Sequence, residues 1–225
     1  MSVYLVGAKN PETRRQVEAQ RAADPSFVVA GFIDNDPAKR DTVFLGLPVL
    51  GGVDVVGNLL LDDPDAKFVN LITGSSSARF EVSRQLANMG CAFTNLIHPD
   101  VDLRDVELGI GNYVQDHVII QAGARIGNNV GLHFSSRISH ETRIGHSAFV
   151  GPAALIAGEV VVGDGAFVGA NATIIPRLQI GRWATIGAGS VVVRDVPDYA
   201  TVVGNPAKVI RTDPPVYTSG DITSV

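Results

Sequence analysis

Residues 113–192 read YVQDHVIIQAGARIGNNVGLHFSSRISHETRIGHSAFVGPAALIAGEVVVGDGAFVGANATIIPRLQIGRWATIGAGSVV. Every sixth residue of this stretch is aliphatic, counted from Val114 to Val192. The 14 positions are Val114, Ile120, Ile126, Leu132, Ile138, Ile144, Val150, Ile156, Val162, Val168, Ile174, Ile180, Ile186 and Val192. An unbroken run of this length excludes chance periodicity and indicates a six-residue structural repeat.

The residue two places before each of these aliphatics is usually small or apolar as well. The examples are Ala124, Val130, Ser136, Thr142, Ala148, Ala154, Val160, Ala166, Ala172, Ala184 and Ser190. Two inward positions separated by one outward residue form one face of a β-strand. The remaining residues, rich in Gly, Asn and Asp, are typical of a corner. A unit of six residues cannot bury its own face, so the repeat predicts stacked coils of strands.

The first part of the chain has a different pattern, in which strand-like and helix-like segments alternate. We expect strands at 3–6, 27–33, 68–72 and 93–97, and helices at 11–23, 53–61 and 75–89. Such alternation predicts a small α/β domain with a parallel, Rossmann-like sheet. We therefore divide the chain into an α/β domain at 1–98, a β-helix domain at 99–210 and a C-terminal tail at 211–225. The sequence leaves open whether this tail is mobile or lies over a neighbouring subunit.

Composition narrows the functional class. Of the 225 residues, 45% are hydrophobic and 18% charged, which is enough apolar material for a buried core. The net charge of −5 argues against a nucleic-acid partner. The single cysteine, Cys91, excludes a disulfide within the chain and fits a reducing compartment. No apolar run is long enough to span a bilayer, so we expect a soluble cytoplasmic protein without a membrane partner.

Four stretches of the sequence carry a resemblance to a known family. They are FIDNDPAK at 32–39, NLIHPD at 95–100, SSRISHETRIG at 135–145 and VVGNPAKVI at 202–210. Together with the repeat they resemble the hexapeptide-repeat acyltransferases, in the branch of the sialic acid O-acetyltransferases (NeuD-like) and the bacillosamine and perosamine N-acetyltransferases. This resemblance implies a left-handed parallel β-helix with three hexads per coil and a homotrimer. It also implies that acetyl-CoA is the co-substrate, that no metal is needed, and that the α/β domain binds a sugar nucleotide.

The chemistry of acetyl transfer directs attention to His140. The reaction needs a base for the nucleophile, donors for the oxyanion and a groove for CoA. A coil of 18 residues would put Ala122 one coil below His140 and Gly158 one coil above it, which leaves space around the imidazole. By resemblance, His140 is the general base, Glu141 tunes it, and Gly158 lies near the acetyl carbonyl. In the alternative reading, His140 is a polar corner residue at a subunit interface.

The resemblance also assigns residues to CoA and to the acceptor. It implies that Ala170 and Ala188 line the CoA groove, and that Phe149 stands where some members use a histidine to contact CoA. The family usually has Asn at the position of His133, close to the acceptor, so His133 is a candidate substrate contact. A site of this kind draws on two neighbouring subunits.

Residues of the α/β domain form the candidate acceptor site. Members of the family carry a Gly-rich loop of the type G-A-S/G-G-H after the first strand, where backbone N–H groups bind phosphate. In the corresponding GAKNPE loop (residues 7–12) only Gly7 and Ala8 match; Lys9 supplies a positive charge, whereas Pro11 removes a donor. Further matches are Asp34 and Asn35, at the position of an acidic pair, and Gly74 in the next strand-end loop. The altered loop leaves two alternatives, a non-nucleotide acceptor or a domain that is only a structural adapter.

The sequence also bears on other functions of the histidines and of the whole protein. A zinc site like that of the γ-type carbonic anhydrases would need a histidine at Ser135, so no metal site is expected. We expect acetyl-CoA-dependent N- or O-acetylation of a sugar, in the first place a nucleotide-linked one, in surface glycan biosynthesis. The acceptor would attack the thioester directly, because Cys91 lies in the first domain. The rivals are the same chemistry on a small non-nucleotide acceptor, and a non-catalytic trimeric scaffold. The sequence leaves open the acceptor, N- versus O-acetylation and the length of the acyl chain.

Overall fold

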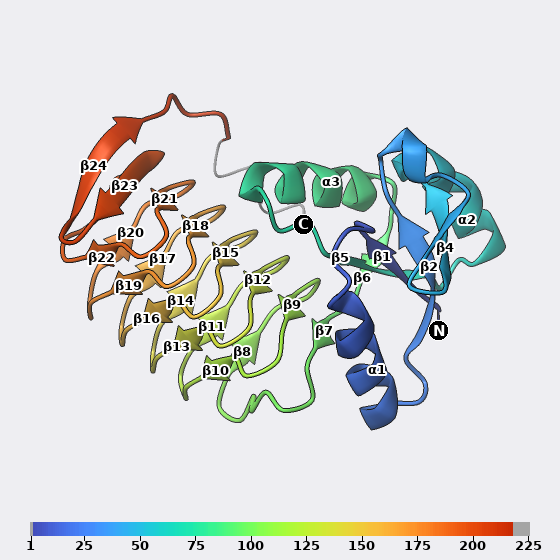
Figure 1. Cartoon of the computed structure of the whole chain (residues 1–225), viewed down its shortest axis with the longest axis horizontal. Helices are drawn as coiled ribbons and strands as arrows, with labels where there is room; N and C mark the ends of the chain where they lie inside the picture. Colours follow the sequence, from blue (N-terminus) through green and yellow to red (C-terminus); the bar gives the residue numbers. More distant parts are fainter. Residues whose placement is uncertain (1, 218–225) are drawn as a thin grey trace.

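The computed structural model describes residues 2–217, which form an α/β domain at one end of a long β-helix (Figure 1). The α/β sheet has the order β3-β4-β2-β1-β5-β6. Its strands are β1 (Ser2–Val6), β2 (Val28–Ile33), β3 (Thr42–Phe44), β4 (Leu47–Gly51), β5 (Lys67–Asn70) and β6 (Ala92–Phe93). All pairs are parallel except β3 with β4. The predicted parallel-sheet domain is confirmed.

Three α-helices complete this domain. They are α1 (Thr13–Ala23), α2 (Val56–Asp62) and α3 (Ser76–Asn88), with two short 3-10 turns, η1 (Pro37–Lys39) and η2 (Val53–Val55). The predicted cap of α3 is present, since the Ser75 hydroxyl accepts a hydrogen bond from Ala78 N at 3.2 Å. Leu86 of α3 is fully buried in the core against the α/β sheet, and the buried Phe80 ring packs 5.5 Å from that of Trp183 in the β-helix. Packing therefore holds α3 in addition to its cap.

Two local predictions for this domain were wrong. The run 93–97 is not one strand, because β6 pairs with β5 whereas β7 (Leu96–Ile97) pairs with the first coil of the β-helix. Asn95 separates them, since its carboxamide donates to Gly109 O at 3.0 Å and accepts from Asn112 N at 2.9 Å. The β3–β4 hairpin was also missed, because its two-residue loop, Leu45-Gly46, reaches positive φ without the usual Asn-Gly pair.

The β-helix has three parallel faces, which we name by their first strands. The β10 sheet contains β10 (Ile119–Ile120), β13 (Arg137–Ile138), β16 (Leu155–Ile156), β19 (Thr173–Ile174) and β22 (Val191–Val192). The β8 sheet contains β8 (Glu107–Leu108), β11 (Arg125–Ile126), β14 (Arg143–Ile144), β17 (Val161–Val162) and β20 (Gln179–Ile180). The β7 sheet contains β7, β9 (Tyr113–Val114), β12 (Gly131–Leu132), β15 (Phe149–Val150), β18 (Phe167–Val168), β21 (Thr185–Ile186), β23 (Ala200–Gly204) and β24 (Ala207–Thr212).

The predicted coil length and the predicted inward positions are confirmed. Strands of one face pair in register with partners 18 residues away, as Ile120 does with Ile138. All 14 aliphatics of the six-residue series belong to the buried core of the β-helix, and so do the small residues two places before them, apart from the buried polar Ser136, Thr142 and Ser190. The chain passes from the β7 sheet to the β10 sheet, then to the β8 sheet and back, which defines three corners.

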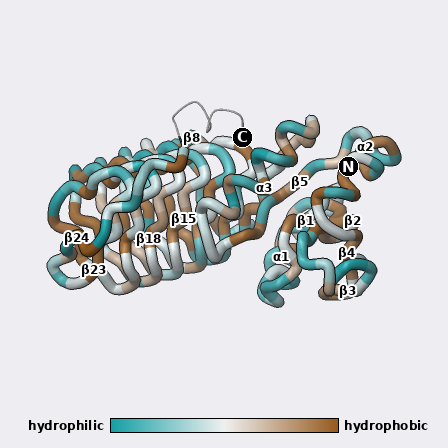
Figure 2. Tube along the Cα trace, turned by 90° about the horizontal axis from the view of Figure 1, so that it is seen from above, coloured by the Kyte–Doolittle hydropathy of each residue, from teal (hydrophilic) through white to brown (hydrophobic). Residues whose placement is uncertain are grey.

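The α/β domain packs against the corner between the β8 and β7 sheets through α3, and α1 also reaches the first coil (Figures 1 and 2). At the other end the antiparallel β23–β24 pair closes the stack. Residues 213–217 of the predicted tail return to the protomer itself, where the Tyr217 ring lies 4.4 Å from Trp183 and 5.0 Å from Phe80 of α3. The rest of the predicted tail, 218–225, lies outside the described residues.

The domain limits at residues 98 and 210 remain predictions; hydrogen bonding joins β7 to the β-helix sheet ahead of the first limit, and β24 continues to Thr212. Within residues 2–217, no helix has both the length and the apolar character required to cross a bilayer.

Candidate active site

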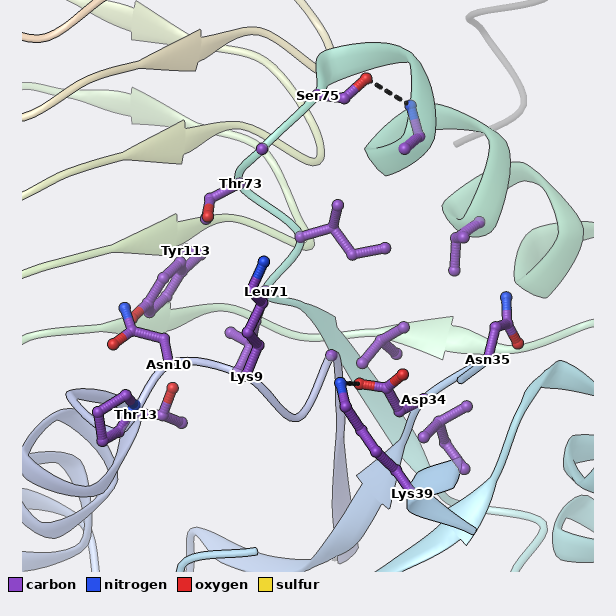
Figure 3. Close-up of a pocket in the computed structure, with 18 residues that line it drawn as sticks. Lys9, Asn10, Thr13, Asp34, Asn35, Lys39, Leu71, Thr73, Ser75 and Tyr113 are labelled. Carbon is purple, nitrogen blue, oxygen red and sulfur yellow. Dashed lines mark hydrogen bonds and ion pairs between the residues drawn. The ribbon is translucent and has the colours of Figure 1, made fainter. Parts of the chain in front are cut away.

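A cavity of about 660 Å³ opens where β1, β2 and β5 end (Figure 3). Because these strands are parallel, the loops that follow them meet at one edge of the sheet. The cavity brings together five residues singled out in the sequence: Gly7, Lys9, Asp34, Asn35 and Gly74. The β-helix contributes Tyr113 of β9 to the wall, so the cavity lies between the two parts of the chain.

Asp34 is held by the protein on both carboxylate oxygens. Oδ2 accepts from Ala8 N at 2.8 Å and from Lys39 Nζ at 2.7 Å, and Oδ1 accepts from Asp36 N at 3.0 Å. Partial burial of this carboxylate raises its pKa, but the hydrogen bonds from Lys39, Ala8 and Asp36 outweigh that effect and hold the pKa below its ordinary value. Asp34 is therefore ionised at neutral pH, and it ties the β1–α1 loop to the β2–η1 loop.

Lys9 is the free positive charge of the cavity. Its side chain extends into the cavity (Figure 3), and within residues 2–217 its ammonium has neither an ion pair nor a hydrogen bond. Gly7, two residues before Lys9, has φ +108, a conformation that residues with a side chain rarely adopt. The opposite wall is the β5–α3 loop with Gly74 and Ser75 at the start of α3. A free cation facing a helix N-terminus is suited to an anionic group.

Asn35 also lines the cavity, but its side-chain oxygen is occupied by a contact within the protein. Its Oδ1 accepts from Val53 N at 2.9 Å, and a Cβ on Gly52 would lie only 2.5 Å from that oxygen. Asn35 thus also supports the turn before η2. Lys39 and Tyr113 also line the cavity, and neither was predicted from the sequence. Lys39 could have been predicted, because it is the last residue of the FIDNDPAK motif. No pattern in the sequence marks Tyr113 as a cavity residue.

His140 lies at the corner between the β10 and β8 sheets, with its side chain 58% exposed. Its backbone N–H donates to Gln121 Oε1 at 2.9 Å, and its Nδ1 lies 3.6 Å from Glu141 Oε2. That separation is longer than a hydrogen bond, so the two side chains are neighbours without a hydrogen bond between them. Gln121 was missed in the sequence, where nothing distinguishes it from other corner residues.

Gly158 lies directly beside the His140 ring, as the 18-residue spacing predicts. A Cβ on Gly158 would stand 2.6 Å from Nε2 and 2.7 Å from Cε1 of His140. Any side chain at this position would therefore displace the imidazole. On the other side, a shallow hollow of about 550 Å³ is lined by His140, Gln121, Ala122, Asp102 and Arg104.

The two candidate sites are separate within one protomer. The cavity at the ends of β1, β2 and β5 borders the β7 sheet through Tyr113. His140 lies at the corner between the other two sheets, across the coil from the β7 sheet. The residues that line the cavity and those that line the hollow at His140 have no member in common. One protomer therefore does not bring the predicted acceptor residues and the predicted base together.

Comparison with known proteins places this geometry in a family. The model of the bacterial transferase hexapeptide (six repeats) matches residues 141–176 and 159–194. A structure of a histidine variant of perosamine N-acetyltransferase from Caulobacter crescentus, in complex with CoA and GDP-perosamine, is 33% identical, with a TM-score of 0.82 over 93% of this chain and 96% of that one. The chain is a hexapeptide-repeat acyltransferase of the NeuD-like family. The resemblance is confirmed, and so is the fold class, an α/β domain followed by a left-handed parallel β-helix.

Two further structures are similar to this acyltransferase. The acetyltransferase domain of PglB from Neisseria gonorrhoeae, in complex with acetyl coenzyme A, is 26% identical with a TM-score of 0.77, over 93% of this chain and 98% of that one. WeeI from Acinetobacter baumannii is 24% identical with a TM-score of 0.79, over 93% of this chain and 100% of that one, and supports the fold alone. No curated protein sequence matches the chain.

The residues predicted to bind CoA differ in exposure. In the acyltransferase Ala170 and Ala188 are both exposed at the corner between the β7 and β10 sheets, one coil apart. Phe149 is buried, and its ring stacks on Phe167 with 4.7 Å between centroids and 15° between planes. The structure therefore offers the two alanines to a ligand, but it does not offer the Phe149 ring.

His133 is buried between the rings of Tyr113, at 5.9 Å, and Phe149, at 4.7 Å. Its Nε2 has no hydrogen-bond partner among the described residues. Burial, assisted by the nearby charge of Arg79, lowers the pKa of His133 to about 4. The imidazole is thus neutral at pH 7, and its contact with a substrate remains a prediction.

Cys91, the single cysteine of the chain, is poorly suited to act as a nucleophile. Cys91 is buried, and burial raises the pKa of its thiol to about 11, so at neutral pH it is not a thiolate. Within residues 2–217, no three His, Cys, Asp or Glu side chains are grouped so that they could hold a metal ion.

Proposed function

We propose that the acyltransferase moves the acetyl group of acetyl-CoA to an amine or hydroxyl of a nucleotide-linked sugar. The observation that carries this proposal is the cavity at the ends of β1, β2 and β5, where the Lys9 cation is unpaired and faces the N-terminus of α3. A diphosphate is the group that such a site suits best. The similar perosamine N-acetyltransferase, whose structure contains CoA and GDP-perosamine, supports the same assignment.

In the proposed mechanism His140 is the general base. Its free nitrogen takes a proton as the acceptor nitrogen or oxygen attacks the thioester carbonyl, and the new C–N or C–O bond forms. The C–S bond then breaks, and the proton passes to the departing CoA thiolate. Glu141, 3.6 Å from Nδ1, stabilises the transient imidazolium by charge. Gly158 leaves room for the carbonyl beside the ring, with its backbone N–H in the role of oxyanion donor.

The separation of the two sites supports an active site shared between protomers. We place the acceptor in the cavity of one protomer, with Gly7, Ala8, Lys9, Asp34, Asn35 and Gly74, and the base on His140 of a neighbour. Acetyl-CoA would lie between them along Ala170 and Ala188. Exposed apolar side chains on and beside the β10 sheet suit the interface of a homotrimer; they include Ile119, Phe134, Ile175 and Val193.

We keep His133 as a proposed acceptor contact, because a neutral imidazole with a free Nε2 can donate or accept one hydrogen bond. We also propose that the reaction belongs to surface glycan biosynthesis and takes place in the cytoplasm, since Cys91 requires no oxidising compartment.

A specific observation favours a second candidate, the same chemistry on a non-nucleotide acceptor. Both oxygens of Asp34 and the Oδ1 of Asn35 already bind protein groups, and Pro11 cannot donate from its backbone nitrogen. A titration with nucleoside diphosphates separates the two candidates. Saturable binding that Lys9→Ala weakens supports the nucleotide-linked acceptor, and the absence of binding supports the alternative.

The proposed function is tested by the release of free thiol from acetyl-CoA with a panel of nucleotide amino-sugars and free sugars. Release that requires both an acceptor and His140 supports the proposal. Full activity of His140→Ala would overturn the mechanism. If no acceptor in the panel causes thiol release and the protein does not bind CoA, a non-catalytic scaffold is favoured.

A further inference from the structure

Arg79, in the first turn of α3, is completely buried as a cation and pairs with backbone carbonyls. Burial lowers the pKa of its guanidinium to about 9, which still leaves the group protonated at neutral pH. Within residues 2–217 its hydrogen bonds run to four oxygens: Asn129 O at 2.7 Å, Asn70 O at 2.7 Å, Ile72 O at 3.1 Å and Val130 O at 3.3 Å. A buried charge costs free energy that an apolar side chain would not, so its partners indicate what it does.

The four carbonyls belong to two different parts of the molecule. Asn70 O lies at the end of β5, and Ile72 O lies in the β5–α3 loop. Residues 71–75 of this loop form one wall of the cavity at the ends of β1, β2 and β5. Asn129 O and Val130 O lie at the β-helix corner just before β12. One planar guanidinium therefore joins the cavity wall to the β-helix.

A chain of buried side chains reinforces this link. The Asn70 amide donates to Ser83 Oγ at 2.8 Å, Ser83 Oγ donates to Asn129 Oδ1 at 3.0 Å, and the Asn129 amide donates to Ser147 Oγ at 2.9 Å. Asn70 Oδ1 in turn accepts from Ile72 N at 2.8 Å, inside the cavity wall. These four side chains are at most 1% exposed. Fully satisfied buried networks of this kind fix one arrangement of the backbone.

Gly131 of β12 lies next to the Arg79 guanidinium, at ordinary van der Waals distance. A Cβ on Gly131 would lie 3.2 Å from Phe149 Cδ2 and 3.9 Å from Arg79 Cζ. The guanidinium is thus enclosed by the β-helix surface on one side and by the β5–α3 loop on the other.

We propose that Arg79 is a positioning residue that holds the β5–α3 loop, and with it the acceptor in the cavity, at a fixed place against the β-helix. The inference rests on the proposed function, because it takes this cavity as the acceptor site. Lysine cannot replace Arg79, since a compact ammonium does not span carbonyls on both sides in the planar geometry of a guanidinium.

The test is the steady-state kinetics of Arg79→Lys and Arg79→Met, with Arg21→Met, exposed at the end of α1, as the matched control. We expect the KM for the acceptor to rise at least about tenfold in both Arg79 variants and the KM for acetyl-CoA to stay within about twofold. A purely structural role would lower kcat through the fraction of folded enzyme and leave both KM values unchanged. That result would overturn the proposal.

A second variant and a second measurement cover the other outcomes. If the Arg79 variants do not fold, Ser83→Ala decides: an acceptor KM raised about threefold supports the proposal, and a wild-type value contradicts it. If the wild type itself shows no acceptor-dependent thiol release, the proposed function fails. Hydrogen exchange of residues 71–75 in Arg79→Lys, or in Ser83→Ala, then still decides the positioning role, because unchanged exchange would refute it.

Discussion

At the scale of single residues, function depends on where the fold leaves space and where it leaves polar groups without partners. Gly158 leaves space for His140, the Lys9 ammonium has no partner in the described chain, and Nε2 of His133 is buried without one. Gly158 and His133 depart from what packing alone would favour, because one removes a side chain beside a ring and the other buries a polar nitrogen. Such departures are common at functional sites.

Gly158→Ala is expected to disable catalysis without unfolding the protein. The added methyl would lie 2.6 Å from His140 Nε2, so the imidazole must leave its position at the corner. We expect kcat/KM to fall about 100-fold or more, the size of effect expected for a displaced base. Thiol release and the melting temperature measure the two effects.

The matched control is Gly57→Ala in α2, where a Cβ would meet no atom within 4 Å. That variant should keep full activity and gain about 0.5–1 kcal/mol of stability. Equal activity of the two alanine variants would contradict a role for the His140–Gly158 contact.

Acid should destabilise the protein through His133. Its pKa is lowered to about 4 in the folded chain from an ordinary 6.5, so between these pH values the unfolded chain binds more protons. The contribution of His133 to the free energy of unfolding is therefore fully present at pH 7. It is lost as the pH falls from about 6.5 to about 4, by up to about 3 kcal/mol.

Urea unfolding at pH 7 and pH 4.5 tests this, with His133→Asn as the comparison. The wild type should lose about 2 kcal/mol more than the variant between the two pH values. Identical losses would show that His133 titrates normally in the folded state.

At the scale of elements, the strict six-residue period predicted the β-helix strands, because each coil must repeat the contacts of the last. The site was predicted less completely. Gly7, Lys9, Asp34 and Gly74 could be grouped from sequence because loops at the ends of parallel strands converge. Tyr113 and Arg79 could not, since their roles arise only when the α/β domain packs on the β-helix and no local pattern records that contact.

Helix α3 has a cap that was predicted from the local sequence, and the contribution of this cap to stability can be measured. Ser75→Ala removes the acceptor for Ala78 N, which should cost about 1 kcal/mol of folding free energy. Ser77→Ala is the control, because Ser77 is exposed and its hydroxyl, within residues 2–217, hydrogen-bonds only to that of Ser75. Chemical denaturation of the two variants gives the comparison, and equal stability would exclude the cap as a significant contribution.

At the scale of the whole molecule, the cavity and His140 lie on different sides of one protomer. If a neighbour supplies the base, two inactive variants should complement each other. In mixed oligomers of Lys9→Ala and His140→Ala, a site is intact when its cavity comes from one variant and its base from the other. Random mixing makes that true for one half times one half, or about a quarter, of the sites.

Co-expression with two purification tags, followed by the thiol-release assay, measures the recovery. Oligomers of the double variant Lys9→Ala/His140→Ala with either single variant are the control and should stay inactive. If the mixed oligomers show no recovery although both single variants are inactive, each protomer must carry its own complete site.

The 18-residue coil has a consequence for how this chain can change in length. Removing six residues after Gly158 would rotate every later corner by one face, whereas removing or adding 18 would return each corner to its own side. Successive coils lie about 4.8 Å apart, so the distance between His140 and the closing β23–β24 hairpin can change only in steps of that size. The length of the surface along the stack therefore changes only in whole coils. If CoA lies along the coils as proposed, the number of coils sets the length that the extended CoA molecule must span between the hairpin end and His140.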